Sequence, residues 1–181
     1  MNKVGTKTDN SFLKEKIYLR LSNLPKLESI KVLDCYAGKS IIWNEIKKRS
    51  KKQINVIGID KKQYGVNLKG ENLKYIPSID LNNFDVIDLD AYGIPYKQLK
   101  LIFDRKYKGI LFITFIQSMF GCLPKQFLID LGYKKTMIKK CPTLFYKNGI
   151  EKFKNWLALN DIKAIKRLSY NNKHYIYCKI N

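Results

Sequence analysis

The stretch Lys31-Val-Leu-Asp-Cys-Tyr-Ala-Gly-Lys-Ser40, followed by Val56-Ile-Gly-Ile-Asp60, decides the fold of this chain. Each segment is a run of aliphatic and β-branched residues that ends in a carboxylate. Small residues follow the first run, where the chain turns into an apolar helix. A strand, a tight turn and a helix in this order typically hold a nucleotide-like ligand. The pattern therefore predicts a β-α-β unit that binds an adenosine-containing cofactor.

The rest of the chain predicts strands that alternate with helices, which is typical of an α/β protein with a mainly parallel sheet covered on both faces. We expect strands at residues 30–34, 55–60, 73–77, 84–90 and 109–115, and helices at 11–24, 41–48, 95–103, 125–131 and 150–159. Turn residues 169–173 lie between two apolar runs and predict a C-terminal antiparallel β-hairpin. We interpret residues 1–181 as one domain, with a polar tail and docking helix in 1–28 and a core over 29–181.

The chain carries 35 Lys and Arg residues against 15 Asp and Glu residues, a formal net charge of +20. Clustered cations release counterions from phosphates, so this charge favours nucleic acid as a partner. A compositional bias that replaces Arg by Lys is the alternative. Such a bias explains the many lysines better than it explains the shortage of acids.

The cysteines and the single histidine indicate neither a disulfide framework nor a metal site. Cys35, Cys122, Cys141 and Cys178 form no C-x-x-C pair, and His174 has no companion. We therefore expect a reduced, cytoplasmic protein without a bound metal. No run approaches the roughly 18 apolar residues of a membrane span, so we expect no membrane association.

The turn at Gly38 fits neither of two common phosphate-binding loops. Lys39-Ser40 mimics the end of G-x-x-x-x-G-K-S, but Leu33 stands where that motif needs its first glycine. The dinucleotide pattern G-x-G-x-x-G also fails, because Gly38 has no second glycine beside it. A cofactor without phosphates tolerates such a sparse turn. S-adenosylmethionine is an adenosine cofactor of this kind.

These residues carry a family resemblance. Val32-Leu-Asp-Cys-Tyr-Ala-Gly38 resembles the first motif of class I S-adenosylmethionine-dependent methyltransferases, whose acid lies near the methionine end of the cofactor. Val56-Ile-Gly-Ile-Asp60 resembles the second, whose carboxylate accepts hydrogen bonds from both ribose hydroxyls. The resemblance spans nearly the whole chain and implies a Rossmann-like methyltransferase fold with a seven-stranded sheet. It implies S-adenosyl-L-methionine as cofactor, with contacts from Asp34, Tyr36, Ala37, Gly38, Asp60, Lys61 and, on the adenine side, Asp80.

The segment Phe84-Asp-Val-Ile-Asp-Leu-Asp-Ala-Tyr-Gly-Ile-Pro95 bears on the acceptor. It is more similar to the D-x-D-P-[FY]-G-x-P of tRNA guanine-N2 dimethyltransferases than to the D-P-P-Y of other amino methylases, although Ala91 replaces the proline. The resemblance implies that Asp90 orients an amine and that Tyr92 stacks on its base, with RNA preferred over DNA. A plain helix entry is the simpler interpretation of Gly93 and Pro95.

Two alternatives stay open at this point: a DNA amino methyltransferase, and a non-catalytic nucleic-acid-binding protein with a degenerate methyltransferase fold.

Two further features bear on a nucleic acid partner. Phe120 follows the fifth strand and could stack on a base or pack in the core. Lys134, Lys135, Lys139 and Lys140 could follow a phosphate backbone or form an ordinary solvated face.

Overall fold

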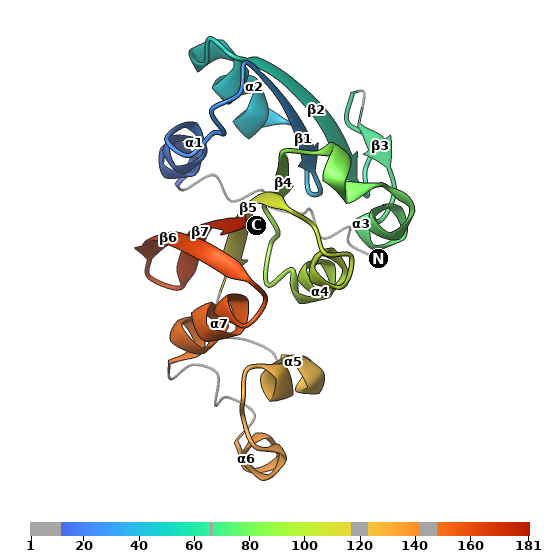
Figure 1. Cartoon of the computed structure of the whole chain (residues 1–181). Helices are drawn as coiled ribbons and strands as arrows, with labels where there is room; N and C mark the ends of the chain where they lie inside the picture. Colours follow the sequence, from blue (N-terminus) through green and yellow to red (C-terminus); the bar gives the residue numbers. More distant parts are fainter. Residues whose placement is uncertain (1–11, 66, 117–122, 142–147) are drawn as a thin grey trace, which may run out of the picture.

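A seven-stranded sheet runs through the computed structural model, which describes residues 12–65, 67–116, 123–141 and 148–181 (Figure 1). The strand order is β3-β2-β1-β4-β5-β7-β6. Strands β1 to β5 pair in parallel, and β7 is antiparallel to both β5 and β6. The strands span Ser29–Asp34, Gln53–Asp60, Leu68–Lys69, Val86–Leu89, Gly109–Ile116, Ile162–Tyr170 and Lys173–Ile180. The predicted parallel sheet with a terminal hairpin is confirmed.

The central strands β1 and β4 are nearly pure core. Ile30, Val32 and Leu33 of β1 are fully buried, and every residue of β4 is buried. Their parallel register places Asp34 beside Asp88. Because parallel strands end at the same edge of a sheet, the loops after β1, β2 and β4 meet there.

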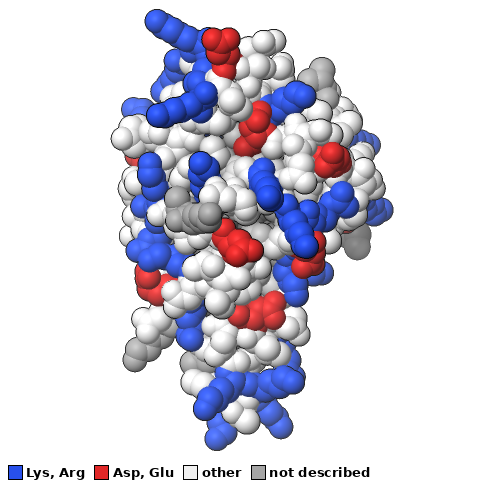
Figure 2. All heavy atoms as spheres, in the orientation of Figure 1, with Lys and Arg blue, Asp and Glu red and all other residues white. Residues whose placement is uncertain are grey.

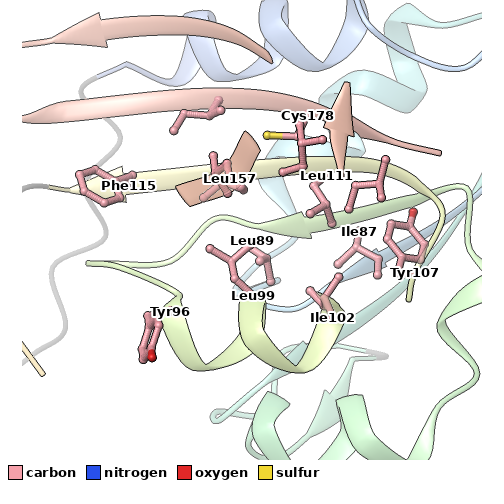
Figure 3. Packing of buried hydrophobic residues seen from close by; sticks show 14 of the residues in the cluster. Ile87, Leu89, Tyr96, Leu99, Ile102, Tyr107, Leu111, Phe115, Leu157 and Cys178 are labelled. Atoms are coloured by element: carbon pink, nitrogen blue, oxygen red, sulfur yellow. The ribbon is translucent and has the colours of Figure 1, made fainter. Parts of the chain in front are cut away.

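Helices cover both faces of the sheet (Figure 1). On one face, α1 (Leu13–Leu21) and α2 (Ile41–Arg49) bury Ile17, Trp43 and Ile46. On the other, α4 (Tyr96–Asp104) packs Leu99 and Ile102 against the sheet, as Figure 3 shows. That second face is completed by α3 (Asn72–Tyr75), α5 (Lys125–Asp130) and α7 (Gly149–Ala158). Helix α1 packs on the sheet through Ile17 and Leu19, which are both buried.

The third strand was placed wrongly by the sequence pattern. Residues 73–77 lie in α3 and in a 3₁₀ turn, Ile76–Ser78, and the strand is the two-residue segment Leu68–Lys69. The Asn72 side chain donates to the carbonyl of Cys35 (2.9 Å) and holds this segment as a helical turn. Pro77 could not have donated to a strand ladder. A short helix that the sequence pattern did not predict, α6 (Lys135–Lys140), follows α5.

Candidate active site

The turn after β1 is held by Asp60, the last residue of β2. Its Oδ2 accepts a hydrogen bond from the Gly38 backbone N–H (2.9 Å), and its Oδ1 accepts one from Lys62 N–H (2.9 Å). Gly38 has a φ of +50°, a conformation that favours glycine. A Cβ built on Gly38 would meet no atom within 4 Å, so the turn faces open space. The two predicted cofactor residues are thus joined in one rigid element with a free surface.

Asp34, Tyr36 and Ala37 lie beside this turn. The Asp34 carboxylate is buried and accepts the Tyr36 backbone N–H (3.2 Å). Burial, followed by the charges of Asp88 and Asp90, raises the pKa of Asp34 well above its ordinary value. Tyr36 is partly buried, which raises its pKa to about 12. Burial therefore disfavours the charged form of both side chains.

Lys61 lies at the same edge, whereas Asp80 does not. Lys61 is exposed and pairs with Glu71, which follows β3 (3.3 Å). Asp80 caps the 3₁₀ turn Leu81–Asn83, which precedes β4. That turn touches the start of β5 through Asn82, whose Oδ1 accepts the Lys108 backbone N–H (3.1 Å). The structure therefore places Asp80 near the amino ends of the strands, away from Asp60. Glu71 is the acid that follows the third strand.

A buried ion pair lies behind the edge. Both oxygens of Asp88 accept hydrogen bonds from Arg20 of α1, at 2.6 and 2.7 Å, and Oδ2 also accepts the indole N–H of Trp43 (2.8 Å). Each side chain of the pair is 1% exposed. Burial opposes the charge of Arg20, but Asp88 outweighs it and raises the pKa of the guanidinium. The pair and the indole therefore fix α1 and α2 to β4, the strand that precedes Asp90.

Asp90 receives a second cation from the same helix. Lys16 Nζ lies 2.9 and 3.0 Å from the two carboxylate oxygens, and the hydroxyl of Thr114 on β5 donates to Oδ1. Burial disfavours the carboxylate, but Lys16, Arg20 and Thr114 outweigh burial and lower its pKa. The side chain is 16% exposed, so solvent reaches it. Asp90 is thus an ionised, oriented carboxylate at the mouth of the site.

The loop after Asp90 presents an aromatic ring. Tyr92 is 82% exposed, while Ala91 before it is buried. Gly93 has a φ of +125°, which lets the chain reverse before Pro95 and α4. Phe120 lies outside the described residues, so its predicted position is untested. Tyr92 therefore presents an exposed aromatic ring two residues after Asp90.

Sequence reasoning missed Lys16, Arg20, Trp43 and Thr114. The sequence carries a signal for Lys16 and Arg20. These two cations lie four residues apart on one helix and flank its apolar stripe. Buried carboxylates need partners, so Asp88 and Asp90 implied such cations without identifying them. Among the residues that the structure describes, no cluster of His, Cys, Asp and Glu is arranged to hold a metal ion. None of the described helices is both long and apolar enough to span a membrane.

Solved structures share the fold of this chain, although no family model and no curated protein matches it. An S-adenosylmethionine-dependent methyltransferase from Archaeoglobus fulgidus aligns at 15% identity with a TM-score of 0.58, covering 94% of each chain. The chain has the class I methyltransferase fold. A ribosomal protein L11 methylase from Lactobacillus delbrueckii aligns at 13% identity with a TM-score of 0.58, over 96% of this chain and 81% of that one.

A third similar structure widens the range of substrates. The precorrin-6y C5,15-methyltransferase from Geobacter metallireducens aligns at 11% identity with a TM-score of 0.55, over 100% of this chain and 93% of that one. These neighbours include a ribosomal protein methylase and a precorrin methyltransferase. The methyltransferase fold therefore leaves the acceptor open, because function lies in the site that a fold carries.

Proposed function

We propose that this chain is an S-adenosylmethionine-dependent methyltransferase that modifies a base amine of nucleic acid, with guanine N2 of tRNA or another structured RNA as the preferred acceptor. One observation carries the proposal: the open Gly38 turn, clamped by Asp60, lies at the same sheet edge as the ionised Asp90. The Gly38 turn with Asp60 suits a cofactor, and Asp90 suits a methyl acceptor. The high net charge supports a polyanionic substrate.

The residues around Gly38 fit S-adenosylmethionine. Each Asp60 oxygen accepts one backbone N–H, which leaves a lone pair on each for a ribose hydroxyl. The open space above Gly38 lets a ligand approach the backbone closely. Asp34, Tyr36 and Ala37 would line the methionine end. Lys61 and Glu71 lie at the same edge, and Asp80 is left out of the proposed cofactor site.

The acceptor would be positioned by Asp90 and Tyr92. The bound cofactor supplies an electrophilic methyl group. Lys16 and Thr114 occupy part of the Asp90 carboxylate, which has about four lone-pair sites, so one remains for an amine N–H. The ring of Tyr92 is free to stack on the base that carries this amine. Orientation of the two reactants is the main source of rate acceleration in such a site.

The proton of the acceptor amine would leave to water. The lowered pKa of Asp90 suits this carboxylate to accept a hydrogen bond rather than to hold a proton at neutral pH. Lys16 and Thr114 act through Asp90, so both are positioning residues. In this proposal, residues 29–181 form the catalytic core and α1 supplies the cations that orient its acceptor carboxylate.

Nucleoside mass spectrometry tests the proposal. RNA and DNA are incubated separately with the protein and methyl-labelled S-adenosylmethionine, digested and analysed. We expect labelled N2-methylguanosine from RNA and none from DNA. Label on a DNA base amine alone would overturn the choice of RNA. No label in either nucleic acid, together with no heat of cofactor binding in calorimetry, would overturn the enzyme.

A further inference from the structure

Five lysines gather on the segment that follows β5. Lys125, Lys134, Lys135, Lys139 and Lys140, here called the lysine surface, are all exposed on or beside α5 and α6. None of them forms an ion pair with any residue that the structure describes. Figure 2 shows the blue cluster around α6 at the lower end of the molecule. This region therefore carries concentrated positive charge.

The one nearby acid does not neutralise this charge. Asp130 is the only acidic residue in 123–141, and it accepts hydrogen bonds from Tyr96 (2.5 Å) and Gln126 (2.7 Å). Lys100 of α4 lies 3.5 Å from it. These partners come from α4 and α5 rather than from the lysine surface. The five ammonium groups thus remain available to an external anion.

Among the residues of helix α6, only the partly buried Ile138 packs against the core. The helix has six residues and none is fully buried. A helix of this length is marginal in water without tertiary support. Beside it lies a hollow of about 460 Å³ with apolar walls from Leu123, Leu128 and Ile138. Lys125, Lys135 and Lys139 stand at the same hollow. The combination is an apolar recess with cationic residues around it.

Helix α5, which lines this recess, contacts the start of α4. Tyr96 begins α4, directly after the loop that carries Asp90 and Tyr92. Its ring lies 4.7 Å from that of Phe127 on α5, and its hydroxyl donates to Asp130 on the same helix. Helix α5 is therefore fixed to the start of α4. The lysine surface is thus linked through α5 to the start of α4, which follows the Asp90 loop, and not to the Gly38 turn.

We propose that the lysine surface binds the phosphate backbone of a single-stranded segment of the RNA substrate, and that one unpaired nucleotide enters the apolar hollow. The inference rests on the proposed function and deepens it. Lysine acts on phosphates as a point charge, which suits binding that follows a backbone without reading sequence. Apolar walls suit the face of an unpaired base, which a duplex would keep stacked.

A charge-matched pair of variants tests the surface. Lys135→Gln/Lys139→Gln removes two charges from the hollow, and Lys47→Gln/Lys51→Gln removes two exposed lysines at the far end of α2. Fluorescence anisotropy with a labelled 12-nucleotide single-stranded RNA measures the dissociation constant over a series of KCl concentrations. We expect at least tenfold weaker binding for the first pair and a salt slope smaller by about 1.4, since each phosphate contact contributes about 0.7 for a single strand.

The remaining outcomes separate this inference from the proposed function. Equal losses in the two double variants, or no loss in the first, would overturn the lysine surface. Equal affinity for a 12-base-pair RNA duplex would overturn the role of the hollow, and tighter binding of polyglutamate than of RNA would overturn the nucleic acid partner. Cofactor affinity in calorimetry should be the same in all variants. RNA binding without methyl transfer would refute the proposed function and leave the lysine surface intact.

Discussion

Asp60 ends β2 and Asp90 follows β4, so both lie at the carboxyl edge of the sheet. Different kinds of groups hold the two carboxylates in place. Among the residues that the structure describes, Asp60 accepts hydrogen bonds from two backbone N–H groups, those of Gly38 and Lys62. Asp90 is held by side chains, from Lys16 on α1 and Thr114 on β5. The first carboxylate keeps free lone pairs toward solvent, and the second is largely enclosed among charges. The two halves of the edge therefore differ in where their support comes from.

This difference separates a local site from a tertiary one. The Gly38 turn and Asp60 belong to one β-α-β unit, so folding that unit is enough to bring them together. Asp90 needs the N-terminal helix, whose Arg20 also neutralises Asp88. Damage to α1 should therefore impair the acceptor half and spare the cofactor half. The following changes test that division, from the largest expected effect to the smallest.

Arg20→Met should cause the largest loss of stability. It leaves Asp88 buried with no cation, and breaking a buried pair from one side costs about 3–5 kcal/mol. Urea unfolding followed by circular dichroism measures the change. Arg49→Met, which breaks an exposed pair with Glu45, should cause a much smaller loss, because solvent screens that pair. A loss below about 1 kcal/mol for Arg20→Met would contradict the assigned role of the buried pair.

A double variant keeps this prediction informative if Arg20→Met does not fold. Arg20→Met/Asp88→Leu removes both charges, and a buried pair can often be replaced by apolar residues without loss. The indole N–H of Trp43 then lacks its acceptor, which costs about 1–3 kcal/mol. We expect the double variant to be more stable than the single one. The opposite order would mean that Asp88 is not the group that Arg20 neutralises.

Lys16→Met should lower methyl transfer at least about tenfold and shift its pH profile. Lys16 favours the ionised form of Asp90, so its removal raises the pKa of Asp90. The acidic limb of the rate profile should then move to higher pH, because the carboxylate is lost earlier as the pH falls. Lys14→Met, on the exposed side of α1, is the control and should leave the profile in place. If the acidic limb of the rate profile does not move in Lys16→Met, then Lys16 does not act on the acceptor half of the site.

Gly38→Ala should weaken S-adenosylmethionine binding about tenfold or more. The added methyl group would project into the open space that we assign to the cofactor. Gly132 also has a positive φ, +83°, and open space around it, so Gly132→Ala is a matched control. Both changes should cost about 1–2 kcal/mol of stability, because L residues disfavour this conformation. Calorimetric titration that shows equal cofactor affinity in the two variants would contradict the assigned position.

Asp34→Asn should stabilise the protein by about 1 kcal/mol at neutral pH, a typical size for one substitution. The raised pKa of Asp34 means that the folded state favours the protonated carboxyl. Its contribution to stability is complete below the ordinary pKa and is lost as the pH rises through the raised value. The gain over wild type should thus appear in thermal unfolding at pH 7 and vanish at pH 3. A lower melting temperature at pH 7 would refute this account.

The sequence predicted the elements whose information is local. Strands β1, β2, β4 and β5 are apolar runs, and the hairpin has turn residues between such runs. Strand β3 was missed because two residues carry no periodicity, and the apolar segment 73–77 was taken for it instead. Asp80 was misplaced with it, since the acid that follows the real third strand is Glu71. Lys16 and Thr114 stand 74 and 24 positions from Asp90, a distance that no local motif spans.

The most direct test of the account measures both halves in one pair of variants. Asp60→Asn and Asp90→Asn are compared for S-adenosylmethionine affinity by calorimetry and for methyl transfer to RNA at saturating cofactor. We predict that Asp60→Asn weakens cofactor binding about 10-fold to 100-fold, as expected for lost hydrogen bonds to a charged group. Asp90→Asn should bind the cofactor as wild type does and transfer no methyl group. Weakened binding in Asp90→Asn with intact binding in Asp60→Asn would contradict the division of roles.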